Sequence, residues 1–369
     1  MAFATRSLCL AFATLTLAGI GQAQIVIGSG RASGMGRAGL AVPYDWNSSG
    51  RLNPAIYGLL PSQFRFSVPG LAYRFQGLSF NDLRTYSGNI NDGGLDPNQL
   101  SDLARNLGDE NVEFGLGLSG SFFMSGFALD FSGEGLAATR PNASLQAWSG
   151  SGANGAPPAD AQLDAYGVAG YETGFAYGRR IRMDGVPDAS LGVRVKLVKS
   201  YYTHQFVDSN AIANNSGSTL GSEMGGNQVL SRDSAGVDLG IILSSSKTEG
   251  FFAGATIDNF ITPETSFAAT LPNNVVGTKI IRPYARMVNA GVGYLTPDRF
   301  MVAADVYDIF NGGGAKEFRS GFEYLMTDWF ALRGGYASRS GFTMGVGLGD
   351  INLAYSTQYP GQFNYAFRF

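Results

Sequence analysis

The stretch Met287–Leu295 reads MVNAGVGYL, and its side chains alternate between two kinds along its whole length. Val288, Ala290, Val292 and Tyr294 are apolar, whereas the residues between them are asparagine or glycine. Successive side chains of a β-strand point to opposite faces of a sheet. The stretch therefore predicts a strand with one apolar face and one small or polar face.

The same alternation recurs along the chain from residue 112 onward. It is clearest in VEFGLGLSG (112–120), LGVRVKLVKS (191–200), GVDLGIIL (236–243) and FTMGVGL (342–348). The candidate strands are 64–69, 71–80, 111–119, 121–132, 135–147, 164–180, 187–207, 228–245, 249–260, 282–296, 299–309, 316–326, 328–338, 341–349, 350–357 and 362–369. The first two are short enough to lie outside the main sheet.

A soluble β-sandwich and a membrane β-barrel both produce this alternation. The composition favours the barrel. Only 15% of the residues are charged, compared with about 25% in soluble domains. The polar faces are rich in glycine, which suits a crowded lumen with close backbone approach better than a solvated surface. We therefore predict an all-β fold, a transmembrane antiparallel barrel of about fourteen strands, because bacterial barrels have an even number of strands.

Aromatic residues support the same fold. Several occur near the ends of the predicted apolar faces, as in the interfacial girdles of membrane barrels: Tyr294, Trp329, Phe330 and Tyr336. The chain ends in NYAFRF, which places Tyr365, Phe367 and Phe369 on one face. This ending resembles the C-terminal signal that the barrel-insertion machinery reads in bacterial outer-membrane proteins. The alternative is an aromatic edge strand.

The N-terminus predicts export. Residues 1–23 combine a basic residue, Arg6, with an uncharged apolar run and small residues before Ala23, as in a cleaved secretory signal peptide. A membrane anchor is the alternative, but the run is shorter than the ~20 apolar residues of a spanning helix. The single cysteine, Cys9, lies in this segment, so we expect no disulfide in the mature chain. The balance of 29 acidic and 26 basic residues argues against a nucleic-acid partner.

A glycine-rich stretch after this segment imitates a cofactor site. Gly34-Met35-Gly36-Arg-Ala-Gly39 matches G-x-G-x-x-G, the fingerprint of dinucleotide-binding folds. That fold also needs a helix after the glycines and an acidic residue about twenty positions further on. The chain instead continues with Pro43 and a polar turn, so we expect no cofactor.

No constellation for catalysis or metal binding accompanies the strands. The single histidine, His204, lies near Asp208, but no nucleophile motif such as G-x-S-x-G occurs. One histidine and a cysteine in the signal segment supply too few ligands for zinc. We therefore expect neither an enzyme nor a metal site.

Three polar insertions interrupt the strand pattern, at 149–162, 208–227 and 262–278, and are expected to be long outer loops. One segment has helical signals, with Asp96 as N-cap, Pro97 at the first position and an apolar stripe that ends before Gly108.

Read onward, the glycine-rich stretch becomes GMGRAGLAVPYDWNSSGRLNPAIYGLL. It resembles the N-terminal region of the FadL-type outer-membrane family, and is more similar still to the PorV and TraF-like relatives, where G-M-G-G-A precedes an Asp-containing turn and N-P-A. The resemblance implies that residues 24–62 form a hatch inside a barrel of residues 63–369. The implied hatch residues are Gly34, Met35, Gly36, Gly39, Asn53, Pro54 and Ala55. Arg37 stands where the relatives usually have glycine.

The resemblance implies passive transport of hydrophobic small molecules, long-chain fatty acids or hydrocarbons, across the bacterial outer membrane. The alternative is a non-transporting barrel that binds partners in a secretion or conjugation system, as the PorV and TraF-like relatives do. The expected partners are outer-membrane lipid, the insertion machinery, and either a hydrophobic ligand or secretion or conjugation proteins. A soluble periplasmic β-protein is a third possibility.

Overall fold

The computed structural model describes residues 30–43, 50–76, 112–151, 158–182, 187–208, 229–245, 249–263, 267–270, 278–281, 284–312, 316–338, 341–349, 351–357 and 362–365. The predicted signal peptide, the predicted helix at 96–108, Phe367 and Phe369 lie outside these residues.

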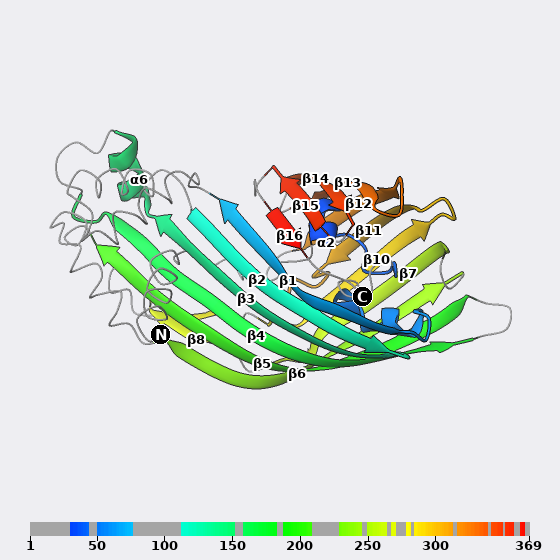
Figure 1. The fold of residues 1–369 in the computed structure, drawn as a ribbon. Helices are drawn as coiled ribbons and strands as arrows, with labels where there is room; N and C mark the ends of the chain where they lie inside the picture. Colours follow the sequence, from blue (N-terminus) through cyan, green and yellow to red (C-terminus); the bar gives the residue numbers. More distant parts are fainter. Residues whose placement is uncertain are drawn as a thin grey trace, which may run out of the picture.

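Fourteen antiparallel strands form one closed barrel, in which β1 pairs with both β2 and β16 (Figure 1). The strands are β1 Phe64–Gln76, β2 Val112–Met124, β3 Phe127–Pro141, β4 Gln162–Ile181, β5 Asp188–Asp208, β6 Leu230–Ser244, β7 Gly250–Ile261, β10 Met287–Leu295, β11 Phe300–Tyr307, β12 Glu317–Leu325, β13 Phe330–Ala337, β14 Gly341–Leu348, β15 Ile351–Ser356 and β16 Gln362–Tyr365. The predicted all-β transmembrane barrel of about fourteen strands is confirmed.

A two-stranded sheet and several short helical stretches, among them residues 50–52, complete the described structure. The sheet pairs β8 Phe267–Thr270 with β9 Thr278–Ile281, within an insertion that was expected to be a loop. The other helices are α2 Gly30–Gly34, the 3-10 helix η1 Pro54–Gly58 and α6 Ala143–Gly150. No helix in the described ranges is long and apolar enough to cross a membrane.

The predicted boundaries are wrong at two places. The candidates 64–69 and 71–80 form the single wall strand β1, and the apparent break between them is a bulge between Ser67 and Gly70. The candidates 111–119, 121–132 and 135–147 were divided at the wrong points, because β2 runs unbroken through residue 120 to Met124. The hairpin turn lies at Ser125 and Gly126, which both have positive φ as a two-residue hairpin loop requires, and β3 then runs unbroken to Pro141.

The end of the predicted strand 135–147 is helical, because Asn142 provides a helix cap directly after Pro141. The Asn142 side chain accepts a hydrogen bond from the Leu145 backbone N–H at 2.9 Å, which starts α6.

The wall strands present apolar side chains outward and mostly small or polar side chains inward, as predicted, although a few large apolar ones such as Phe252 also point inward. In β10, Val292 and Tyr294 are exposed, whereas Asn289 is fully buried. Trp329 and Tyr336 are also exposed on the outer surface. An apolar exterior around a polar interior is the arrangement of a transmembrane barrel.

The two ends of the barrel differ. The connections after β2, β4, β6, β10, β12 and β14 are short and lie at one end, which we call the short-turn end. The strands also differ in length: β4 and β5 have 20 and 21 residues, whereas β10 has 9 and β15 has 6. A membrane crossing takes about 9–11 residues. The wall around β4 and β5 therefore extends well beyond the membrane at the other end (Figure 1).

Candidate functional site

The described N-terminal residues 30–43 and 50–60, which we call the luminal segment, lie inside the barrel. Their backbone contacts inward-facing residues of β4 to β7 on one wall and of β10 to β14 on the other. Most of these residues are buried, including Met35, Leu40, Ile56 and Tyr57 at 0% exposure. The barrel interior near the short-turn end is thus filled by the chain itself.

The turn after α2 requires unusual backbone conformations. Gly36 has φ 64° and Gly39 has φ 126°, both in the region that glycine adopts without strain. Arg37 also has positive φ, 61°, which is uncommon for a residue with a side chain. The glycine that the FadL-type pattern places at this position would fit that conformation, so the departure at Arg37 carries a local backbone strain.

The wall glycines make room for this segment. A Cβ at Gly335 would lie 2.3 Å from the Met35 carbonyl carbon, and one at Gly321 would lie 2.1 Å from the Met35 oxygen. A Cβ at Gly192 would lie 2.2 Å from the Ala55 nitrogen. Real Cβ contacts of this kind do not occur, so a larger residue at these positions would force the backbone apart. The glycine-rich inner face is therefore explained by close backbone approach, as the sequence predicted.

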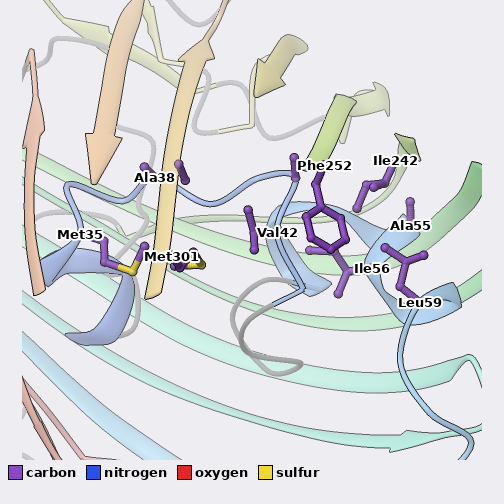
Figure 2. Close-up of a cluster of buried hydrophobic side chains, with 11 residues drawn as sticks. Met35, Ala38, Val42, Ala55, Ile56, Leu59, Ile242, Phe252 and Met301 are labelled. Carbon is purple, nitrogen blue, oxygen red and sulfur yellow. The ribbon is translucent and has the colours of Figure 1, made fainter. Parts of the chain in front are cut away.

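An apolar cluster joins the luminal segment to the short-turn end of the wall (Figure 2). The segment contributes Met35, Ala38, Ala41, Val42, Ala55, Ile56 and Leu59, and the wall contributes Ile242, Phe252, Met301 and Ala303. A second cluster places Tyr57 against Phe123, with ring centroids 5.7 Å apart. Burial of these side chains supplies the main attraction between segment and wall.

Asn53, Pro54 and Ala55 form the start of η1. The Asn53 side chain accepts a hydrogen bond from the Ala55 N–H at 3.0 Å and donates one to the Ile241 carbonyl at 3.3 Å. The Ser190 hydroxyl of β5 donates to the Ala55 carbonyl at 2.6 Å. Asn53 thus caps the helix and binds the wall at the same time, while Pro54 suits the first helical position.

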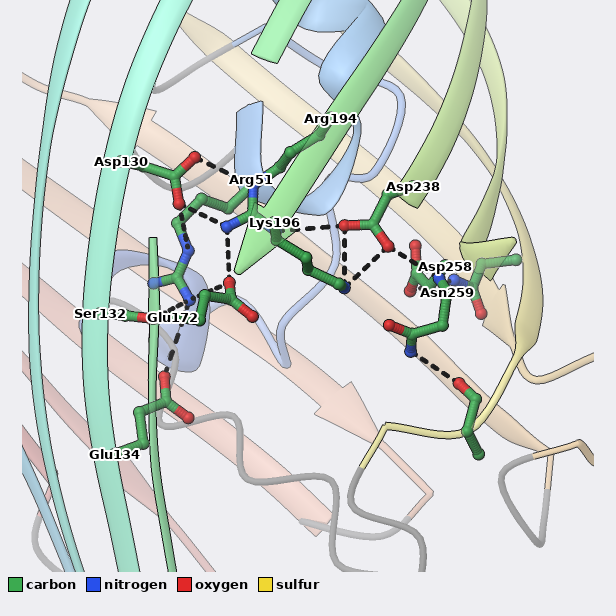
Figure 3. A network of polar contacts seen from close by, with 12 residues as sticks. Arg51, Asp130, Ser132, Glu134, Glu172, Arg194, Lys196, Asp238, Asp258 and Asn259 are labelled. Atoms are coloured by element: carbon green, nitrogen blue, oxygen red, sulfur yellow. Dashed lines mark hydrogen bonds and ion pairs between the residues drawn. The ribbon is translucent and has the colours of Figure 1, made fainter. Parts of the chain in front are cut away.

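A network of buried charges lines the wall beside the segment (Figure 3). Arg194 of β5 lies at its centre. Its Nη2 contacts Asp130 and Glu172 at 2.5 Å each, and its Nη1 contacts Asp238 at 3.1 Å. Lys196 donates to both oxygens of Asp238 at 2.8 and 2.9 Å. Each of these charges has an opposite partner, which buried ions require.

Arg51 connects the luminal segment to this network. Its Nη2 donates to the Ser132 hydroxyl at 2.9 Å and lies 3.5 Å from Glu172. Asp130 and Glu134 are more distant, at 3.9 Å. Burial alone would lower the pKa of the Arg51 guanidinium, but these carboxylates outweigh burial and hold that pKa above its ordinary value.

A second set of polar contacts holds α2. Arg31 pairs with Glu323 of β12, and Arg333 of β13 donates to the same carboxylate at 2.6 Å. Arg333 also donates to Asn352 at 2.8 Å. The Thr343 hydroxyl donates to the Gly34 carbonyl at 3.2 Å.

The turn that follows α2 is held separately. The Asp305 carboxylate of β11 accepts the backbone N–H groups of Gly39 and Leu40, at 2.7 and 3.1 Å. Hydrogen bonds to a charged acceptor are stronger than those between neutral groups.

The structure brings the predicted hatch residues Gly34, Met35, Gly36, Gly39, Asn53, Pro54 and Ala55 together inside the barrel. Tyr365 lies elsewhere, in β16, where it pairs with Leu71 of β1 and Ile351 of β15. His204 lies in β5 opposite Tyr166. Within the described ranges, no group of three or more histidine, cysteine or acidic residues is arranged to hold a metal ion.

The charged partners of the segment were not predicted from the sequence. Arg51, Asp130, Glu172, Asp305 and Glu323 were not identified as candidate residues. Their signal in the sequence was weak: each is a charged residue on the inner face of a predicted strand or in the segment itself. Nothing in the sequence indicated which of them would pair.

The fold and its contents define the class of protein, a transmembrane β-barrel whose lumen is filled near one end by its own N-terminal segment. No protein-family model matches the chain, and no curated protein matches it. Among solved structures, the chain is similar to the Ralstonia pickettii toluene transporter TbuX, with a TM-score of 0.52 and 15% identity over 94% of this chain and 98% of that one.

It is also similar to a deltaS2S3 mutant of the monoaromatic hydrocarbon channel TodX, with a TM-score of 0.50 and 14% identity. That match covers 92% of this chain and 97% of the other. At such low identity the likeness shows a shared fold, which accords with the resemblance to the FadL-type family.

Proposed function

We propose that this protein is an outer-membrane channel for the passive passage of hydrophobic small molecules, with residues 24–62 as its hatch. The observation that carries the proposal is the luminal segment, which is packed by its backbone against wall glycines such as Gly321 and Gly335.

Two further points support transport. The fold is shared with a structure described as a toluene transporter and with one described as a monoaromatic hydrocarbon channel. The apolar cluster around Phe252 and Met301 also lies inside the barrel, where it offers apolar surface to a solute once the segment shifts. The proposal includes export by a signal peptide cleaved after Ala23 and insertion guided by Tyr365, Phe367 and Phe369.

Uptake measurements test the proposal. The full chain would be expressed in bacteria, and uptake of labelled toluene and of a labelled long-chain fatty acid would be compared with cells that carry an empty vector. The expected result is faster uptake of at least one of the two classes. Equal uptake of both with and without the protein would reject transport.

The partner-binding alternative gives a different result. In that case the protein, gently solubilised from outer membranes, would carry a stoichiometric secretion or conjugation protein and would not accelerate uptake. No contact among the described residues favours this alternative.

A further inference from the structure

Two neighbouring rows of residues cross β3, β4 and β5 on the inner wall beside the luminal segment. In the first row, Ser132 lies opposite Glu172. In the second row, two residues further from the short turns, Glu134 lies opposite Gly170, and Gly170 lies opposite Ser200. Residues two apart on a strand share a face, so both rows face the lumen. A solute that enters from the end opposite the short turns therefore reaches the second row first.

Arg51 of the luminal segment bridges the two rows (Figure 3). Its Nη2 donates to the Ser132 hydroxyl at 2.9 Å, and it lies 3.5 Å from Glu172 and 3.9 Å from Glu134. A charge-assisted hydrogen bond to a carboxylate has a length of about 2.7–2.9 Å. Arg51 thus brings a positive charge to the two carboxylates but holds them loosely.

The second row contains a buried hydroxyl group without a hydrogen bond. Ser200 is 1% exposed, and its Oγ has no hydrogen-bond partner in the part of the chain that the structure describes. Gly170, between Ser200 and Glu134, has no side chain that could bond to either. A buried polar group without a partner is unfavourable. The row therefore offers a hydroxyl and a carboxylate to one small polar group.

Tyr284 places an aromatic ring beside the same row. A Cβ at Gly170 would lie 3.3 Å from the Tyr284 hydroxyl oxygen, so the phenol contacts the wall next to Glu134. Burial raises the pKa of this phenol, and the charges of Glu172 and Glu134 raise it further. The ring thus lies close to both carboxylates.

Lys196 shows how this lumen binds an ammonium group. Its Nζ donates to both oxygens of Asp238, at 2.8 and 2.9 Å, and lies 5.7 Å from the ring centre of Tyr284. A ring within about 6 Å adds a cation–π attraction. A compact ammonium group therefore binds a carboxylate here more closely than the Arg51 guanidinium does.

The charge change on release of the segment favours a cationic solute. When Arg51 leaves, the space beside Glu134 and Glu172 becomes more negative by one unit, whatever other charges surround it. A cation on the solute restores the balance, whereas an anion adds repulsion. A ligand shifts an equilibrium towards the state that it binds better, so a cationic solute stabilises the released segment.

We propose that Glu134, Glu172 and Ser200 bind the ammonium group of an arylalkyl amine. The ammonium group takes the place of the Arg51 guanidinium, and the aromatic part of the solute lies against Tyr284. The inference rests on the proposed channel function, because it names the class of solute that the channel favours.

Calorimetric titration of the purified full chain in an uncharged detergent tests this site. The probes are phenethylammonium chloride and sodium hydrocinnamate, which share a phenyl ring and differ in the sign of their charge. The wild-type protein should bind the ammonium at least about fivefold more tightly, the effect of one ion pair. Glu134→Gln and Ser200→Ala should each lower the affinity for the ammonium by about fivefold.

Two further variants sharpen the test. Arg51→Met removes the competing cation, so its affinity for phenethylammonium should rise by about fivefold. Glu317→Gln is the matched control, because Glu317 is a buried carboxylate on the inner face of the other wall, where it pairs with Arg319. Its affinity for the ammonium should equal that of the wild type. Heat-modifiable migration on a gel confirms that each variant is folded.

Four results would overturn the proposal. They are equal binding of both probes by the wild type, unchanged ammonium binding by Glu134→Gln, an equal loss in Glu317→Gln, and unchanged or weaker ammonium binding by Arg51→Met. Uptake separates this inference from the transport proposal. A protein that speeds toluene uptake but binds both probes equally keeps its channel function and loses the ammonium site. A protein that prefers the ammonium but speeds uptake of neither toluene nor a fatty acid keeps the site and loses the channel function.

Discussion

The substitution Gly335→Ala should displace the luminal segment from the wall. The added Cβ would lie 2.3 Å from the Met35 carbonyl carbon and 2.5 Å from the Gly36 nitrogen. Ordinary carbon contacts lie at about 3.5–4.0 Å, so the segment must retreat by roughly 1 Å or more. Both clashing atoms belong to the backbone and cannot rotate away. Overpacking costs about 1–3 kcal/mol, and we take the upper value here. The displaced form should then be roughly a hundredfold more populated.

Cysteine labelling measures this population. Ala38 lies in the segment and is fully buried, and Cys9 is the single cysteine of the sequence. A variant with Ala38→Cys and Cys9→Ser therefore reacts with a water-soluble maleimide only when the segment leaves the wall. Adding Gly335→Ala should speed this reaction by roughly a hundredfold, the same factor as the population change.

The neighbouring glycine provides the control. A Cβ at Gly334 would meet the Phe322 ring at 2.6 Å, on the outer face of the barrel. Phe322 is 43% exposed, so its side chain can turn aside. Gly334→Ala should leave the labelling rate unchanged. If Gly335→Ala labels as slowly as Gly334→Ala and unfolds at the same temperature, the close backbone approach is absent and the reasoning is wrong.

Three further substitutions test the polar contacts of the lumen. Arg194→Met leaves Asp130 and Glu172 buried without their central partner and should lower the free energy of unfolding by about 3–5 kcal/mol in urea titration, whereas Arg194→Lys should lose less. Asp305→Ala removes the acceptor of two backbone N–H groups, at a cost of about 1.5–3 kcal/mol, and should speed labelling at Ala38→Cys at least tenfold. Asn53→Ala removes the cap of η1 and should cost about 1 kcal/mol by the same urea measurement, and an unchanged midpoint would contradict the capping role.

The barrel was predictable because its signal is local. Period-2 alternation in stretches such as Met287–Leu295 assigns each side chain to a face without any knowledge of its partners. The boundary errors arose where local signals compete. We predicted a break between two strands at Gly133 and Glu134. The turn instead lies at Ser125 and Gly126, where two consecutive residues adopt positive φ. A glycine in a wall strand and a glycine in a turn look alike in the sequence.

The partners in the lumen were not predictable for a different reason. Arg51 and Glu172 are far apart in the sequence, and they meet only because the strand register and barrel closure bring β3, β4 and the segment to one place. No local pattern encodes that register. The family motif N-P-A identified Asn53 as a hatch residue. The motif did not show that the Asn53 side chain also binds the Ile241 carbonyl of the wall.

The distances indicate that the two halves of the luminal segment are held unequally. Arg51 is 22% exposed, and its carboxylate partners lie 3.5–3.9 Å away, whereas Arg194 holds two of its own partners at 2.5 Å. Asp130 and Glu172 therefore keep a close partner on the wall if Arg51 leaves. Arg31 is held more firmly than Arg51. Its side chain is only 8% exposed, and it contacts Glu323 directly. Since a partly exposed, loosely paired ion contributes less than a buried, directly paired one, release of the segment should begin around Arg51, while α2 stays in place.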